Sequence, residues 1–320
     1  MSMINKQIFL ISLLVLLAGC KGKKAEQFSA LPFPNVVVPS VIQDQSEVAQ
    51  YLAEHWWDAL TDPQRDYPCD SSLISGVSRK EIEQKFANWT VLLNAVDYNL
   101  AAKSVARLFD RVSACERKDT SSNIFESMTS IVEHYLYDPN SPMRNEDLYG
   151  PYVSGLAGSE LVDEAMRGAY EYDARMCTLN RVGTKAADFR FADKSGRIRS
   201  LYDIKADNII LFFSNPGCTA CLDIINTLKS IPAVAHGVAS GRLAVLNIYI
   251  DEDLKAWREY MPIYPEDWYN GYDPDYVIRT DVLYNVRAIP SLYLLDKDKK
   301  VIMKDAPETR LFDWLDHLSF

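Results

Sequence analysis

This chain of 320 residues has no apolar run long enough to span a membrane, fewer basic than acidic residues, and few histidines and cysteines. The apolar run at residues 8–17 is too short for a membrane helix, which needs about 20 apolar residues. Lysine and arginine number 34 against 44 acidic residues, and the net charge of −10 argues against a nucleic-acid partner. Among 4 histidines and 6 cysteines, only Cys218 and Cys221 form a Cys-x-x-Cys pair, which is half of what a zinc site needs. We therefore expect no metal and no diffusible cofactor.

The first residues have the anatomy of an export signal: Lys6, then the apolar run, then small residues. The ending Leu-Ala-Gly-Cys resembles the lipobox of bacterial lipoproteins, which implies that residues 1–19 are a signal peptide and that Cys20 is lipid-modified. An ordinary signal peptide cut nearby is the alternative. Residues 20–44, with several prolines and no helical periodicity, are interpreted as a tether. We expect a protein anchored to a lipid bilayer of the cell envelope and facing the periplasm.

Helical periodicity dominates residues 45–180, and this stretch predicts an all-α domain of five or six helices without strands. Ser46 is a predicted helix cap, and Ser78 with Glu81 has the spacing of a capping box. The segment His134–Tyr152, rich in Tyr, Pro and Asn, either lines a groove or packs a joint between helices. No chemistry is predicted for this domain.

The isolated cysteines allow several interpretations. Cys69 and Cys115 can pair in an oxidising compartment, although the sequence does not show whether they lie close enough. Cys177, near the domain junction, is either a third redox thiol or a buried cysteine at a helix end.

Residues 181–320 change to strand-like patterns. A hairpin is predicted around residues 194–196. Continuous apolar runs predict buried strands, and helical segments alternate with them. The runs are residues 208–214, 243–250, 291–296 and 300–304. This order predicts a three-layer α/β/α domain after the all-α domain.

The stretch "SNPGCTACLDII" places Cys218 where a buried strand ends and a helix begins. Free N–H groups and the helix dipole lower the pKa of a thiol at such a position. Cys221 lies one turn further on the same face, within reach of a disulfide. An attacking thiolate and a resolving thiol are what thiol–disulfide exchange needs. Two structural thiols are the alternative.

Residues from about 182 to 320 resemble the thioredoxin fold, in the branch of TlpA-like, membrane-anchored thiol–disulfide oxidoreductases. The stretches "GTKAADFRFAD", "ILFFSNPGCTAC" and "YNVRAIPSLYLLDKDKKVIMK" carry the resemblance. It implies that Pro290 is cis, faces the Cys-x-x-Cys pair and positions a substrate strand. The N-terminal half resembles helical domains of unknown function that precede such domains in lipoproteins. A peroxidase is disfavoured because the Pro-Thr-Cys spacing of peroxiredoxins is missing.

The chain departs from the pattern of the family at its proton-transfer groups. Gly217 replaces the usual tryptophan, Phe212 stands where a buried acid is common, and Ile224 replaces a glutamate. Asp223 or Glu266 can substitute for the missing acid, unless both are surface acids.

The predicted function is thiol–disulfide exchange in the reductase or isomerase direction, because Thr219-Ala220 between the cysteines has no cation to stabilise a thiolate. Its partners are disulfide-containing proteins and a membrane or periplasmic thiol donor. The alternative is a binding or scaffolding lipoprotein whose thioredoxin fold has no catalytic role. The aromatic segment Pro262–Ile278, which includes Trp268 and Tyr269, is expected either to form a substrate-binding lip or to cover a sheet edge.

Overall fold

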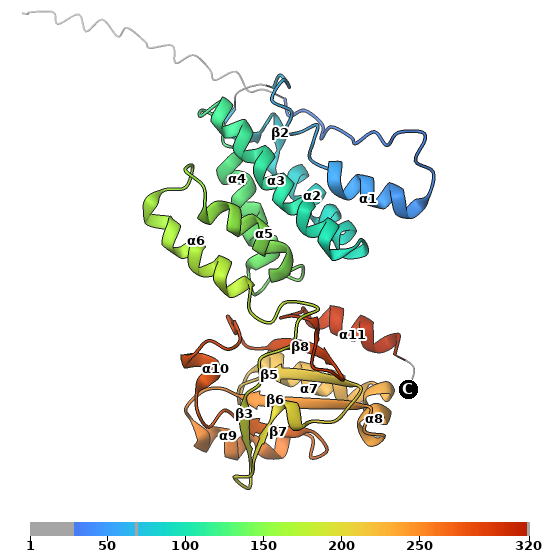
Figure 1. Ribbon diagram of the computed structural model, residues 1–320, viewed down its shortest axis with the longest axis vertical. Coiled ribbons are helices and arrows are strands. Elements are labelled where there is room, and N and C mark those ends of the chain that lie inside the picture. The colour runs from blue at the N-terminus through green and yellow to red at the C-terminus, as the bar shows by residue number, and fades with distance from the viewer. Residues whose placement is uncertain (1–28, 68–69, 319–320) are drawn as a thin grey trace, which may run out of the picture.

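The computed structural model describes residues 29–67 and 70–318, so Cys20, the predicted signal peptide and Cys69 lie outside the described residues. A helical N-terminal part lies on an α/β C-terminal part (Figure 1). Among the described helices, none is long and apolar enough to cross a membrane. The N-terminal helices are α1 (Gln45–His55), α2 (Arg79–Ala95), α3 (Tyr98–Lys118), α4 (Ile124–Val132), the π-helical turn η1 (Glu133–Tyr137), α5 (Glu146–Ala157) and α6 (Glu164–Cys177).

Local signals explain where the helices begin. Ser78 caps α2 and accepts a hydrogen bond from the N–H of Glu81 at 3.3 Å. The Glu81 carboxylate does not close a capping box, because it accepts the N–H of Phe33 at 2.9 Å instead. Asp44, rather than the predicted Ser46, caps α1. These helices pack around a hydrophobic core that contains the aromatic side chains of Trp57, Phe86 and Trp89.

One feature of this domain differs from the prediction. Leu73–Ile74 (β1) and Val77–Ser78 (β2) form a short hairpin in a region predicted to be free of strands. Ser75 and Gly76 make its turn with positive φ angles of 45° and 78°. The segment predicted as a groove or joint is helical from Glu146, even though Pro151 lies inside α5. Pro151 leaves the carbonyl of Asp147 without its helical donor, and the Tyr98 hydroxyl donates to that carbonyl at 3.3 Å.

The C-terminal domain is built on a mixed sheet whose described strands run in the order β4-β3-β7-β6-β5-β8-β9. Strands β5, β6 and β7 are parallel, and the other pairings are antiparallel. The bounds are β3 (Arg190–Asp193), β4 (Ile198–Ser200), β5 (Asn208–Phe213), β6 (Leu243–Tyr249), β7 (Tyr269–Tyr272), β8 (Ser291–Asp296) and β9 (Val301–Met303). The predicted hairpin is β3–β4.

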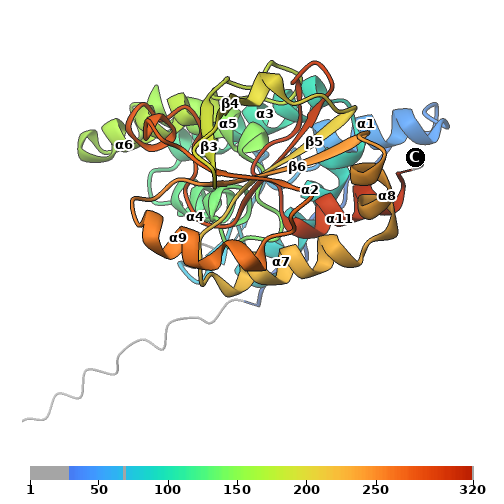
Figure 2. The same ribbon diagram turned by 90° about the horizontal axis from the view of Figure 1, so that it is seen from below.

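Helices cover the sheet as the predicted three-layer order requires. One face packs against α7 (Thr219–Ser230), α8 (Pro232–Ala239), α9 (Leu254–Tyr260) and α11 (Glu308–Asp316), which lie together along one side of the sheet in Figure 2. The other face packs against η2 (Leu201–Asp203) and α10 (Val277–Thr280). An all-α domain followed by a three-layer α/β/α domain is therefore confirmed.

The aromatic segment does not cover a sheet edge. Its residues Tyr269–Tyr272 form β7, which lies inside the sheet between β3 and β6 rather than over an edge. Trp268 is buried in the core on the α7 side of the sheet. A short strand that contains Asn and Gly has little β propensity, so pairing on both sides must hold it in place.

Candidate active site

Strand β5 ends shortly before the two cysteines, which therefore lie at one end of the sheet. After Phe213 the chain turns through Asn215 and Gly217, and Cys218 becomes the N-cap of α7. The Cys218 sulfur accepts a hydrogen bond from the backbone N–H of Cys221 at 3.1 Å. The two sulfurs are bonded to each other, with Cα atoms 5.2 Å apart.

The two sulfurs differ in exposure. Cys221 is only 1% exposed and packs with Phe212 and Ile224 in the core. Cys218 is half-buried, and the exposed Gly217 before it has a φ of +74° with no heavy atom within 4 Å of where a Cβ would lie. The space beside Gly217, directly before Cys218, is therefore open, whereas Cys221 is shielded from solvent. This is the asymmetry that an attacking and a resolving thiol need.

Side-chain hydrogen bonds hold the turn before Cys218 in place. The buried Ser214 hydroxyl donates to the Asn247 amide oxygen of β6 at 2.5 Å, and Asn247 in turn donates to Asn270 of β7 at 3.1 Å. The Asn215 amide donates to Asp251 at 2.5 Å. Side chains at the ends of β5, β6 and β7 thus hold the turn before Cys218 through hydrogen bonds between buried polar groups.

The loop before β8 lies beside the cysteines. The Ile289–Pro290 peptide bond is cis. The next residue, Ser291, pairs with Phe213, so the loop and the turn before Cys218 emerge at the same end of adjacent antiparallel strands. Ile289 and Cys218 both pack against the core cluster that contains Cys221.

Neither candidate acid from the sequence is buried beside the sulfurs. Asp223 is an exposed residue of α7. Glu266 has an exposed side chain, and its carboxylate lies 4.0 Å from the Lys194 ammonium group. The alternative interpretation, that both are surface acids, agrees with the structure.

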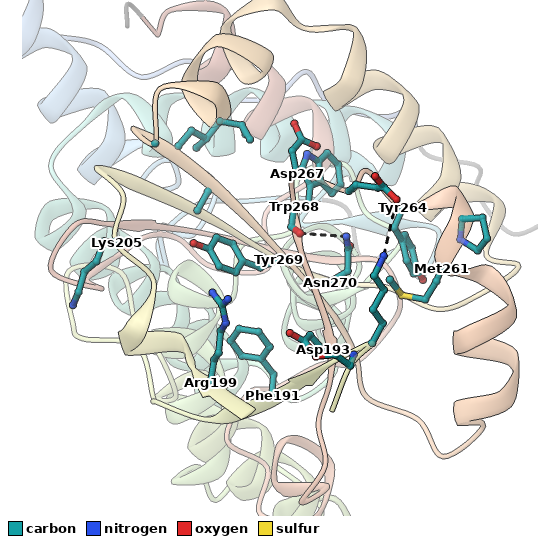
Figure 3. A pocket seen from close by; sticks show the side chains of 18 residues that line it. Phe191, Asp193, Arg199, Lys205, Met261, Tyr264, Asp267, Trp268, Tyr269 and Asn270 are labelled. Atoms are coloured by element: carbon teal, nitrogen blue, oxygen red, sulfur yellow. Dashed lines mark hydrogen bonds and ion pairs between the residues drawn. The ribbon is translucent and has the colours of Figure 1, made fainter. Parts of the chain in front are cut away.

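Glu266 belongs to a separate cavity of about 650 Å³ (Figure 3). Leu243 and Ala244, at the start of β6, line it, whereas Cys218 follows the far end of the neighbouring parallel strand. In the cavity wall the Arg199 guanidinium lies 5.3 Å from the centre of the Tyr269 ring. The cavity therefore lies toward the end of the sheet where β6 begins, away from the cysteines, although Asn270 in its wall also accepts the hydrogen bond from Asn247.

A buried acid that the sequence did not reveal lies behind the cis-proline loop. The Asp305 carboxylate accepts a hydrogen bond from the Ser291 hydroxyl at 2.7 Å, directly after Pro290. Burial, reinforced by the nearby Glu146 carboxylate, raises the pKa of Asp305 to about 6. Asp305 follows β9 in the segment Lys304-Asp305-Ala306, and no pattern in that segment marks the carboxyl group as buried.

The remaining cysteines lie apart from this arrangement. Cys177 ends α6 and is 4% exposed, and burial with the nearby Glu146 charge raises the pKa of its thiol to about 12. This agrees with the prediction of a buried cysteine at a helix end. The Cys115 thiol donates to the Thr61 carbonyl at 3.3 Å, and the question of its pairing with Cys69 falls outside the described residues. Within residues 29–67 and 70–318, no group of three or more His, Cys, Asp or Glu side chains is placed to hold a metal ion.

Comparison with known proteins places this arrangement in a family. Residues 18–180 match the model of DUF5106, a domain of unknown function. A thioredoxin-like protein from Bacteroides caccae is 33% identical, covers 91% of this chain and 100% of its own, and superposes with a TM-score of 0.77. The chain belongs to the thioredoxin-like family.

Shorter structures resemble the C-terminal domain of this thioredoxin-like protein. The C-terminal domain of an uncharacterized protein from Bacteroides fragilis is 43% identical over 43% of this chain and 99% of its own, with a TM-score of 0.42. A domain of a possible thiol-disulfide isomerase from Cytophaga hutchinsonii is 25% identical over 43% of this chain and 93% of its own, with a TM-score of 0.37. No match is found among curated proteins.

Proposed function

We propose that this thioredoxin-like protein is a thiol–disulfide oxidoreductase that reduces or isomerises disulfides in other proteins. The observation that carries the proposal is the Cys218–Cys221 disulfide at the start of α7, in which Cys218 is half-buried and Cys221 is buried. The cis-Pro290 loop beside it offers a place where an extended substrate strand can pair.

The reaction begins with the reduced protein. The Cys218 thiolate attacks one sulfur of a substrate disulfide, forms a mixed disulfide and expels the other substrate sulfur as a thiolate, which takes up a proton. The Cys221 thiol then loses its proton and attacks Cys218, which releases the second substrate thiolate. The substrate gains two electrons, and Cys218 and Cys221 become a disulfide again. A membrane or periplasmic dithiol donor returns the two electrons.

The location is part of the proposal. The lipobox-like ending at Cys20 supports lipid modification of that cysteine and anchoring in the cell envelope, with the globular part facing the periplasm. An oxidising compartment outside the cytoplasm is where substrate disulfides form and persist.

Trapping of mixed disulfides tests the proposal. Cys221→Ser leaves Cys218 able to attack but removes the thiol that resolves the intermediate. In cells of the source organism that express this variant, we expect disulfide-linked adducts that disappear on reduction and are absent from the Cys218→Ser/Cys221→Ser double variant. The Cys177→Ser variant, made in the Cys221→Ser background, is the matched control and should keep the adducts. An absence of adducts, together with no reduction of a model protein disulfide by the unmodified chain, would contradict the proposal and favour a binding role.

A further inference from the structure

The helical domain reaches the cis-proline loop through Glu146, the first residue of α5. Its side chain is only 1% exposed. One carboxylate oxygen accepts hydrogen bonds from Arg287 Nε at 2.8 Å and from the Asn285 amide at 2.9 Å. Arg287 lies three residues before Pro290, so a carboxylate of one domain holds the loop that borders the cysteines of the other.

Arg144 makes a second connection, to the turn between β9 and α11. Its Nε donates to the carbonyl of Asp305 at 3.0 Å, and its Nη2 donates to the carbonyl of Ala306 at 2.9 Å. Ala306 lies in the same core cluster as Cys221 and donates its N–H to Leu292 of β8 at 2.9 Å. Arg144 therefore holds a segment that packs in the same core cluster as the resolving cysteine.

The two connections are joined by buried charges. The Asp305 carboxylate accepts the Ser291 hydroxyl at 2.7 Å and lies 3.3 Å from Arg287 Nη2. On the other side, Lys304 Nζ lies 2.9 Å from the second oxygen of Glu146 and 3.0 Å from the Cys177 carbonyl. Arg287 also covers one face of the Tyr137 ring, with the guanidinium 4.0 Å from the ring centre.

Because these contacts are buried, breaking one of them costs more free energy than breaking a contact at the surface. A buried ion pair adds little net stability, but removing one partner leaves an uncompensated charge in a medium of low dielectric. Neither the loop nor the turn can shift without separating Arg287 from Glu146 or Arg144 from the two carbonyls. The loop is therefore held by the other domain as well as by its own sheet.

We propose that the helical DUF5106 domain is a positioning part of the redox site. In this role Arg144 and Glu146 hold the β9–α11 turn and the cis-proline loop in the geometry that receives the substrate strand. The inference rests on the proposed function, because it assigns the helical domain a task in the same exchange reaction.

Glu146→Gln tests the inference in the chain from Lys21 onward, which contains every described residue. The change keeps the size of the side chain and removes the charge that faces Arg287 and Lys304. Asp58→Asn is the control for loss of a carboxylate charge, because Asp58 is bonded to Arg107 at 2.7 Å and to His55 at 2.8 Å, lies wholly within the helical domain and is more exposed than Glu146. Both variants thus lose one carboxylate charge and its ion pairs.

Two measurements are made on each variant. Hydrogen–deuterium exchange of residues 285–292 reports on the loop independently of activity, and we expect faster exchange in Glu146→Gln only. Kinetics with reduced protein are compared for a protein disulfide, insulin, and a small one, oxidised glutathione. We expect kcat/KM for insulin to fall between about 10- and 100-fold through a higher KM, because misplacement by about 1 Å has effects of this size. The reaction with oxidised glutathione should be unchanged, because it does not need the substrate strand.

The outcomes separate the two proposals. Wild-type protein that reduces neither disulfide would overturn the proposed function. Active wild-type protein, with loop exchange and insulin kinetics in Glu146→Gln equal to those of Asp58→Asn, would overturn only the positioning role. If Glu146→Gln does not fold, Asn285→Ala removes a single hydrogen bond to the same carboxylate. A smaller increase in KM and in loop exchange, in the same direction, is then expected because the ion pairs of Glu146 remain, and its absence refutes the inference.

Discussion

The hydrogen bond from the Cys221 N–H to the Cys218 sulfur should set much of the reactivity of this thiol. Cys221 lies in the first turn of α7, where an N–H has no helical acceptor and a proline is tolerated. Cys221→Pro therefore removes the donor 3.1 Å from the sulfur, whereas Cys221→Ser keeps it. A hydrogen bond to a charged acceptor contributes about 1.5–3 kcal/mol. Since one pKa unit is about 1.36 kcal/mol, the Cys218 pKa should be about 1–2 units higher in Cys221→Pro than in Cys221→Ser.

The assay is the rate of alkylation of Cys218 by iodoacetamide between pH 4 and pH 10, with the product identified by mass spectrometry. Circular dichroism of both variants checks that α7 and the rest of the fold are retained. We also expect the pKa in Cys221→Ser to lie below the usual value of about 8.5 for a cysteine. Equal pKa values in the two variants would refute the reasoning that the N–H stabilises the thiolate. If the Cys218 pKa in both variants is about 8.5 or higher, the argument that the helix terminus lowers this pKa is refuted as a whole.

Four further predictions concern stability and the buried groups. Gly271→Ala should destabilise the protein by about 1–3 kcal/mol in urea unfolding, because the new Cβ would lie 2.7 Å from the Phe191 ring and 3.0 Å from the carbonyl of Ala192. Gly168 lies in α6, and nothing lies within 4 Å of where its Cβ would be, so Gly168→Ala should raise the free energy of unfolding by about 0.5–1 kcal/mol. If Gly168→Ala destabilises the protein as much as Gly271→Ala does, the packing argument is contradicted. Because the pKa of Asp305 is raised from 3.8 to about 6, this carboxyl makes the folded state less stable as pH rises through that window. The free energy of unfolding of Asp305→Asn minus that of wild type should therefore increase by up to about 3 kcal/mol between pH 4 and pH 7. A parallel pH dependence of the two proteins would argue against this account of Asp305. The Cys177 thiol, whose pKa burial raises to about 12, should resist iodoacetamide at pH 8 in the native protein and react after unfolding, so rapid native labelling would show that it is accessible.

Features set by neighbouring residues could be predicted well. The strand before Cys218, the helix after it and the spacing of the two cysteines depend on a dozen consecutive residues, and the structure has them as expected. The same holds for the hairpin of β3 and β4 and for the start of α2 at Ser78. Strand β7 was missed because its sequence, Tyr-Asn-Gly-Tyr, has no strand pattern and pairs only because β3 and β6 lie on either side.

The sequence by itself determined where the bonded cysteine pair lies, because a thiol pair at a helix start is a local arrangement. It also indicated the two-domain order, since helical and strand periodicities occupy separate halves of the chain. Only the tertiary structure decided which charged groups surround the cis-proline loop. Arg144 and Asp305 are 161 residues apart in the chain, and nothing near either residue indicates that they meet in a buried cluster. Burial depends on the packing of two whole domains, and it is burial that turns ordinary surface residue types into groups that hold the site.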